Sequence, residues 1–110
     1  MQHDDTANPW QGRVDALDGA AGRRWHQVVQ PLDQATQPGV ALCGLASDAG
    51  VRRNHGRPGA AEGPRTLRRY LANLAWHGTD RQGLYDAGDV AVVGDALEPA
   101  QSEYAHRVAA

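Results

Sequence analysis

Hydrophobic and polar positions follow two different periods along the chain. The run VALCGLA at 40–46 is short, apolar and rich in small residues, and it follows the turn signal Gln37-Pro38-Gly39. It predicts a strand buried on both faces, as strands of a parallel sheet are. After Gly63-Pro64, which suits a helix start, apolar residues recur at helical spacing and predict a helix over 64–76. Its apolar stripe comprises Leu67, Tyr70, Leu71 and Leu74, and its solvated face is expected to carry Arg65, Arg68 and Arg69.

The flanking segments continue the alternation of helix and strand. The spacing of apolar residues predicts a helix over about 20–30 that ends at Pro31, with Trp25, Val28, Val29 and Leu32 on one side. The segment LYDAGDVAVVGDAL predicts a strand near 83–87 and a second extended piece near 90–93, before a final helix from Glu98-Pro99 that carries Ala100, Tyr104 and Val108 on one side. This order is typical of an α/β domain with parallel strands.

Two or three parallel strands with so few helices leave sheet faces and edges uncovered. The chain is therefore expected to be the front portion of a larger α/β protein, with residues 10–110 in the folded domain. Residues 1–9 are polar and are expected to be disordered.

Composition excludes several classes of protein. The 110 residues suit one domain, and a net charge of -2 argues against a nucleic-acid partner. No apolar run is long enough for a membrane span, and the acidic start is unlike a signal peptide, so a cytoplasmic protein is expected. All eleven basic residues are arginine, which excludes a P-loop lysine and Schiff-base chemistry. The single Cys43 is expected to be an inert core residue without a disulfide.

Positive charge gathers on a glycine-rich loop. Residues 44–69 hold six of the eleven arginines and five of the thirteen glycines. The glycine spacing, GxxGxxxG, is not that of a dinucleotide or P-loop fold. Arginine forks match carboxylates, and glycine lets a backbone approach a ligand, so the loop is a candidate wall for a small anion. The alternative is that these arginines hold the loop in place by bonding to backbone carbonyls, Asp48 or Glu62.

Metal and nucleophile motifs are missing from the sequence. The five histidines are scattered and form no HxH, HExxH or DxHxD pattern. Asp86 and Asp89 form a DxxD that is expected to act as a turn and cap pair after a strand.

The stretch DAGVRRNHGRPGAAEGP resembles the first signature of the ureohydrolase superfamily, which includes arginases, agmatinases and formimidoylglutamases. The form DxGVRRNxGRxGAxEGP is similar to formimidoylglutamases in particular, and WQGRVD, RWHQVVQPL and LYDAGDV extend the resemblance over about residues 10–110. The resemblance implies a three-layer α/β/α fold with a central parallel sheet. It also implies hydrolysis of N-formimidoyl-L-glutamate to L-glutamate and formamide, in histidine degradation. Two Mn(II) ions with a bridging hydroxide would perform the attack.

The resemblance also implies site residues. Asn54 and Arg57, with Arg52 or Arg53, are the candidates to hold the substrate's carboxylates. The GGxHE, DxHxD and DxD motifs that carry the superfamily's metal ligands do not occur here. We therefore expect no catalytic residue, no bound metal and no activity in this chain. The full-length enzyme is expected to be the active species, with a homo-oligomer as one of its possible states. Two alternatives stay open: an agmatinase or other guanidino-compound ureohydrolase, and a non-enzymatic anion-binding or interaction module.

Overall fold

One parallel sheet organises the chain. The computed structural model describes residues 8–79, 81–92 and 94–109. Two long strands, β2 (Gly39–Ala46) and β3 (Gly83–Ala91), pair in parallel, and the two-residue β1 (Gln30–Pro31) pairs in parallel on the other side of β3. The strand order is β1-β3-β2. The predicted α/β class with parallel pairing is confirmed.

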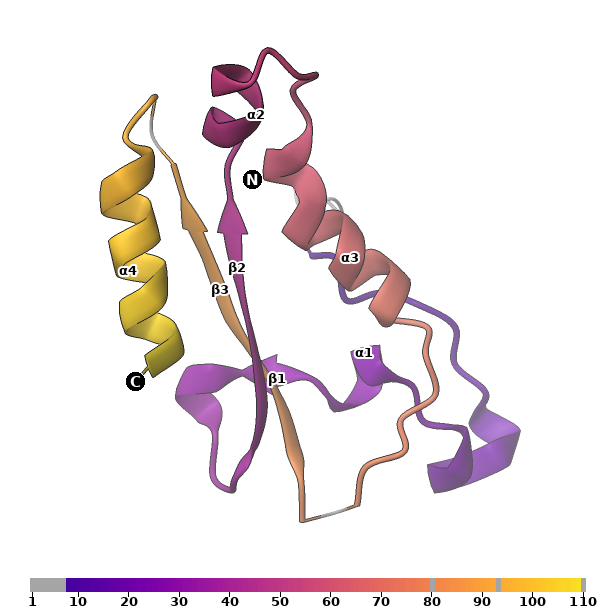
Figure 1. The fold of residues 1–110 in the computed structure, drawn as a ribbon. Coiled ribbons are helices and arrows are strands. Elements are labelled where there is room, and N and C mark those ends of the chain that lie inside the picture. Colours follow the sequence, from indigo (N-terminus) through magenta and orange to yellow (C-terminus); the bar gives the residue numbers. More distant parts are fainter. Residues whose placement is uncertain (1–7, 80, 93, 110) are drawn as a thin grey trace, which may run out of the picture.

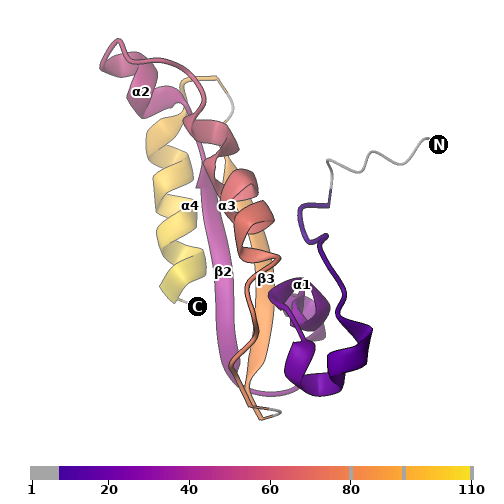
Figure 2. The same cartoon turned by 90° about the vertical axis from the view of Figure 1, so that its right-hand side faces the viewer.

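Helices cover the sheet from two sides. The helix α3 (Gly63–Leu71) connects β2 to β3, and α4 (Leu97–Ala109) follows β3. Figure 1 shows the two long strands between α4 and α3, and Figure 2 shows the same layers from the side. Shorter elements are α1 (Trp25–Val28), α2 (Ala49–Arg53) and the 3-10 turns Ala16–Gly22, Leu32–Gln34 and Ala60–Glu62. Among the residues described, no helix is long and apolar enough to cross a membrane.

The predicted helix over 20–30 is wrong. A 3-10 segment ends at Gly22, only the single turn α1 is helical, and Pro31 lies in β1. The backbone of Gly19, with φ of 56°, interrupts helical geometry. At the start of α1, the Gln27 side-chain oxygen accepts from the Arg24 backbone N–H at 2.9 Å, and the Gln27 N–H donates to the Arg24 carbonyl.

Contacts from distant residues hold this N-terminal segment on the domain. Arg24 donates to Asp15 at 2.8 Å, and Trp25 packs edge-on against Trp76 with ring centroids 6.0 Å apart. Disorder was predicted for residues 1–9, of which residues 1–7 lie outside the described residues. Asn8 is described, and its side chain accepts a hydrogen bond from the Trp10 backbone N–H.

The second half of the domain contains one strand where two pieces were predicted. Strand β3 runs from Gly83 to Ala91, and Val93 lies outside the described residues. The register with β2 shifts once, between Leu42 and Gly44, opposite the segment that contains Gly88 with φ of 75°. Glycine takes this conformation without strain, so the chain passes the irregularity and continues as one strand.

Strand β2 is not buried on both faces, which corrects the prediction. It lies at the edge of the described sheet, its first three residues are exposed, and the other five, including Cys43, are half-buried. The small residues of this strand serve close packing. A Cβ at Gly44 would lie 2.7 Å from Cβ of Pro64 on α3 and 2.1 Å from the Asp89 carboxylate.

Helix α3 is oriented differently from the prediction. It ends at Leu71, before the predicted end at 76. Of the predicted apolar stripe, Leu67, Tyr70 and Leu74 are exposed, Tyr70 by 77%. Arg68, which was predicted on the solvated face, is only 6% exposed and faces the sheet. The prediction followed hydrophobicity alone, whereas the acidic residues of β3 draw an arginine inward.

The buried apolar core that results is small. Among the described residues, its large side chains all come from β3, and its other members are alanines: Leu84, Tyr85 and Val90, with Ala49, Ala72 and Ala100. In α4, Ala100 is buried and Tyr104 half-buried as predicted, while Val108 is 64% exposed.

Candidate functional site

The glycine-arginine loop lies at the carboxyl-terminal edge of the sheet. Residues 47–62 leave the end of β2, form α2 and a 3-10 turn, and return to the first residue of α3. Figure 1 shows α2 beyond the arrowhead of β2, at the same end as the arrowhead of β3. Loops at this edge are where α/β proteins build their binding sites.

Asp48 closes the loop on itself. Its Oδ1 accepts hydrogen bonds from the backbone N–H groups of Gly59, at 2.8 Å, and Ala61, at 2.9 Å. Its Oδ2 lies 3.9 Å from the Arg52 guanidinium, and the side chain is 17% exposed. The hydrogen bonds from Ala61 and Gly59 hold the pKa of Asp48 below its usual range. One carboxylate therefore joins the two ends of the loop.

Arg53 ties the loop to the first turn of α4 and to the residues just before it. Its guanidinium pairs with Glu98 and, at 3.3 Å, with Asp95, and it also donates to the Asp95 backbone carbonyl. The hydrogen bond from Arg53 lowers the pKa of Glu98. Of the four predicted carboxylate-binding residues, Arg53 is thus occupied by acids of the chain itself.

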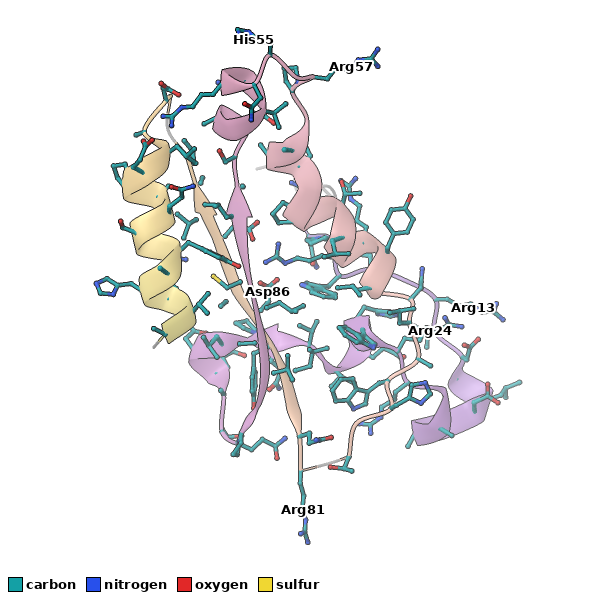
Figure 3. The ribbon with its side chains drawn as sticks, viewed as in Figure 1. Arg13, Arg24, His55, Arg57, Arg81 and Asp86 are labelled. Atoms are coloured by element: carbon teal, nitrogen blue, oxygen red, sulfur yellow. The ribbon has the colours of Figure 1, made fainter. Side chains whose placement is uncertain are left out.

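The remaining predicted residues lie exposed on the loop. The side chains of Asn54 and Arg57 make no hydrogen bond or ion pair with any residue that the structure describes, and Arg52 makes only its long contact with Asp48. In Figure 3, His55 and Arg57 point away from the ribbon at the tip of the loop. His55 has φ of 58°, the left-handed conformation that ends many helices, and here it ends α2.

A second polar cluster, which the sequence interpretation missed, lies inside the fold. Arg68 donates to both carboxylate oxygens of Asp86 at 3.1 Å and pairs with Asp89 at 2.8 Å. The indole N–H of Trp10 donates to Asp86 at 2.7 Å, and the Gly88 N–H donates to the same carboxylate. The expected turn-and-cap role of Asp86 and Asp89 is wrong, because both lie within β3. The sequence did contain a signal, because an arginine in the predicted helix and a DxxD at the end of the predicted strand carry complementary charges.

Burial and hydrogen bonding act in opposite directions on Asp86. Burial opposes its ionisation, but the donors Trp10, Gly88 and Arg68 outweigh burial and hold the pKa of Asp86 below its usual range. A hollow beside Asp86, lined also by Trp10, Val29 and Pro31, lies away from the loop. Because the Asp86 oxygens are already satisfied, this cluster is a structural link between α3, β3 and the N-terminal segment.

The described part of the chain brings no cluster of metal-ligating side chains together. Over residues 8–79, 81–92 and 94–109, no group of three or more His, Cys, Asp or Glu side chains is placed to hold an ion. The described residues therefore do not fit a metal pair, and what they offer at the sheet edge is a set of hydrogen-bond donors.

The fold and the loop together define an α/β protein with a candidate anion site at the carboxyl edge of a parallel sheet. The Arginase family model matches residues 38–110, a segment that begins just before β2 and includes the loop, α3, β3 and α4. The chain belongs to the arginase family.

Several curated relatives are formimidoylglutamases. The chain is 49% identical to the formimidoylglutamase of Aromatoleum aromaticum over 120 aligned residues, which cover all of this chain and 35% of that protein. It is 56% identical to the formimidoylglutamase of Chromobacterium violaceum over 100 residues, 91% of this chain and 32% of that protein. The enzyme of Ralstonia nicotianae is also 56% identical, over 84% of this chain and 28% of its own length. The chain thus spans about a third of the length of the relatives it matches.

Proposed function

We propose that this chain supplies the substrate-binding loop of a formimidoylglutamase, which hydrolyses N-formimidoyl-L-glutamate to L-glutamate and formamide. The observation that carries the proposal is the loop tip, where Asn54 and Arg57 are exposed and have no partner among the described residues. The names of relatives at 49% and 56% identity support the same substrate.

The chemistry of the loop suits a dicarboxylate. The Arg57 guanidinium offers a planar fork to one carboxylate, and the Asn54 amide offers two further N–H donors. Arg52 stands nearby and is held only loosely by Asp48. Arg53 contributes positive charge, but its donors are engaged by Glu98 and Asp95. We therefore assign ligand contact to Asn54, Arg57 and Arg52.

The hydrolytic step belongs to a metal centre, which we propose to be a Mn(II) pair that activates water in the intact enzyme. The described residues offer no ligand set for such a pair. What this chain's residues do is bind and orient the carboxylate end of the substrate. We place the enzyme in the cytoplasm and in histidine degradation, with no nucleic-acid or membrane partner.

An NMR titration of the 110-residue chain tests the proposal. L-Glutamate, the reaction product, should shift the backbone amides of Asn54 to Arg57 in a saturable way, and Arg57→Ala should abolish saturation. Arg69→Ala is the matched control, since Arg69 is exposed on α3 without a partner among the described residues. The cation agmatine should give no shift.

Three results separate the candidate functions. A preference for agmatine over L-glutamate would instead favour an agmatinase. Equal shifts with sulfate and L-glutamate would favour a general anion-binding module. The absence of any saturable shift with L-glutamate would refute the proposal.

A further inference from the structure

The tip of the candidate loop has no packing of its own. Residues 52–60 are all exposed, and the tip lies outside the sheet and the two long helices. Without contacts to hold it, a segment of this kind would sample many conformations, and a ligand would have to order it at a cost of about 0.5–1.5 kcal/mol per side chain. The contacts that restrict the tip are therefore decisive for binding.

Two anchors restrict it, and they lie on its two sides. Asp48, which precedes the tip, accepts hydrogen bonds from the N–H groups of Gly59 and Ala61, which lie 11 and 13 positions further along the chain. At the end of α2, Arg53 reaches 42 and 45 positions along the chain to Asp95 and Glu98. Both anchors are charged side chains with partners inside the chain.

Hydrogen bonds and one glycine conformation fix the course of the backbone between the anchors. The Gly56 N–H donates to the Val51 carbonyl at 2.8 Å, which closes α2 behind Asn54. Gly59 has φ of 144°, a conformation that L side chains rarely adopt, and this turn brings its N–H to Asp48. The tip residues Asn54 and Arg57 thus stand between two fixed points.

We propose that Asp48 and Arg53 are positioning residues, which hold Asn54 and Arg57 in the arrangement that receives a carboxylate. The inference rests on the proposed function for the ligand, and on the contacts above for the mechanism. Asp48 acts through the Gly59 and Ala61 amides, and Arg53 acts through Asp95, just before α4, and Glu98, in its first turn. Neither side chain touches the ligand. Arg53, a substrate-binding candidate by sequence, thereby acquires a different role.

The test compares Asp48→Ala with Asp48→Asn in the 110-residue chain. Because both amides donate to the same oxygen, asparagine keeps the acceptor and loses only the charge, whereas alanine removes the acceptor. L-Glutamate affinity should fall about fivefold in Asp48→Ala and stay within about twofold in Asp48→Asn, as expected from the loss of preorganisation. Asp33→Ala, which removes an exposed carboxylate without a described partner, should leave affinity unchanged.

Amide hydrogen exchange gives a readout that needs no ligand. The Gly59 and Ala61 amides should be protected in the parent and in Asp48→Asn, and exposed in Asp48→Ala, while the Leu84 amide in β3 reports that the domain stays folded. If L-glutamate does not bind the parent, the proposed function fails, and exchange still decides whether Asp48 fixes the loop.

Arg53→Met tests the second anchor independently of Asp48. It should lower L-glutamate affinity about threefold by releasing the tip and should leave the protection of Gly59 and Ala61 in place. Unchanged exchange in Asp48→Ala, equal losses of affinity in the two Asp48 variants, or unchanged affinity in Arg53→Met would overturn the inference. An Asp48→Ala chain that loses Leu84 protection would also overturn it, since Asp48 would then support the whole domain.

Discussion

The arginine that faces the sheet offers the sharpest test of how the domain is held together. Arg68→Met removes a guanidinium that is 7% exposed and keeps a long, unbranched side chain in the helix. Two carboxylates then lose their cation: Asp86, which is 22% exposed, and Asp89, which is 30% exposed. The link between α3 and β3 would be broken at its centre.

The expected loss is large for a core of this size. Removing one partner of a buried ion pair costs about 3–5 kcal/mol. Water reaches both carboxylates here, and Asp86 keeps its donors Trp10 and Gly88, so we expect about 2–3 kcal/mol. With a urea m value of about 1–1.5 kcal/mol per M, the unfolding midpoint should fall by about 2 M.

Urea unfolding followed by tryptophan fluorescence measures this change. Arg69→Met is the control, because the neighbouring Arg69 is exposed and should shift the midpoint by no more than about 0.5 kcal/mol. Adding Asp89→Asn to Arg68→Met should recover part of the loss, since it removes an unpaired charge. If Arg68→Met and Arg69→Met unfold at the same urea concentration, the cluster does not hold α3 on the sheet.

Three further predictions concern the same layer of the fold. Arg65→Met should raise stability or leave it unchanged, because Nε and Nη2 of Arg65 are buried without a described partner and such donors cost about 1–3 kcal/mol; a lower urea midpoint would contradict this. Gly44→Ala should lower stability by about 1–3 kcal/mol in the same assay, since its methyl group would meet Pro64 and Asp89; an unchanged midpoint would show that α3 can move away. Asp86 has a folded pKa below its usual value of 3.8, so its contribution is present above about pH 4 and is lost as pH falls through the folded pKa. Asp86→Asn should therefore weaken the fall of the free energy of unfolding at acidic pH. An unchanged pH dependence would show that Asp86 does not contribute to it.

The sequence correctly predicted the elements whose local turn and helix-start signals match the positions they take in the fold. The run at 40–46, the Gly63-Pro64 helix start and the Glu98-Pro99 helix start all correspond to described elements within a few residues. Proline and glycine fix the backbone locally, so their signals survive whatever the rest of the chain does. Parallel pairing followed from the order of these elements.

The errors arose where distant residues decide. Helical spacing at Trp25 and Val28 was real, but Arg24 pairs with Asp15 and the segment is drawn into a strand at Pro31. The inward face of α3 was assigned wrongly because a hydrophobicity pattern contains no information on ion pairs. Arg68 is buried because Asp86 binds its guanidinium in place of water. Both errors involve contacts between residues at least nine positions apart, the ion pairs of Arg24 and Arg68 and the pairing of Pro31 with β3, which no periodic pattern contains.

The candidate site shows the same division within one loop. Sequence reasoning found the loop, because glycine and arginine concentrate there, but it could not distinguish a free arginine from a paired one. The structure distinguishes them: acids at the start of α4 and in β3 neutralise Arg53 and Arg68, whereas Arg57 has no described partner. A chain with a net charge of -2 thereby presents uncompensated positive charge at one edge of its sheet. An excess of positive charge at this edge, on a loop that the paired Arg53 anchors, is what would attract a small dicarboxylate.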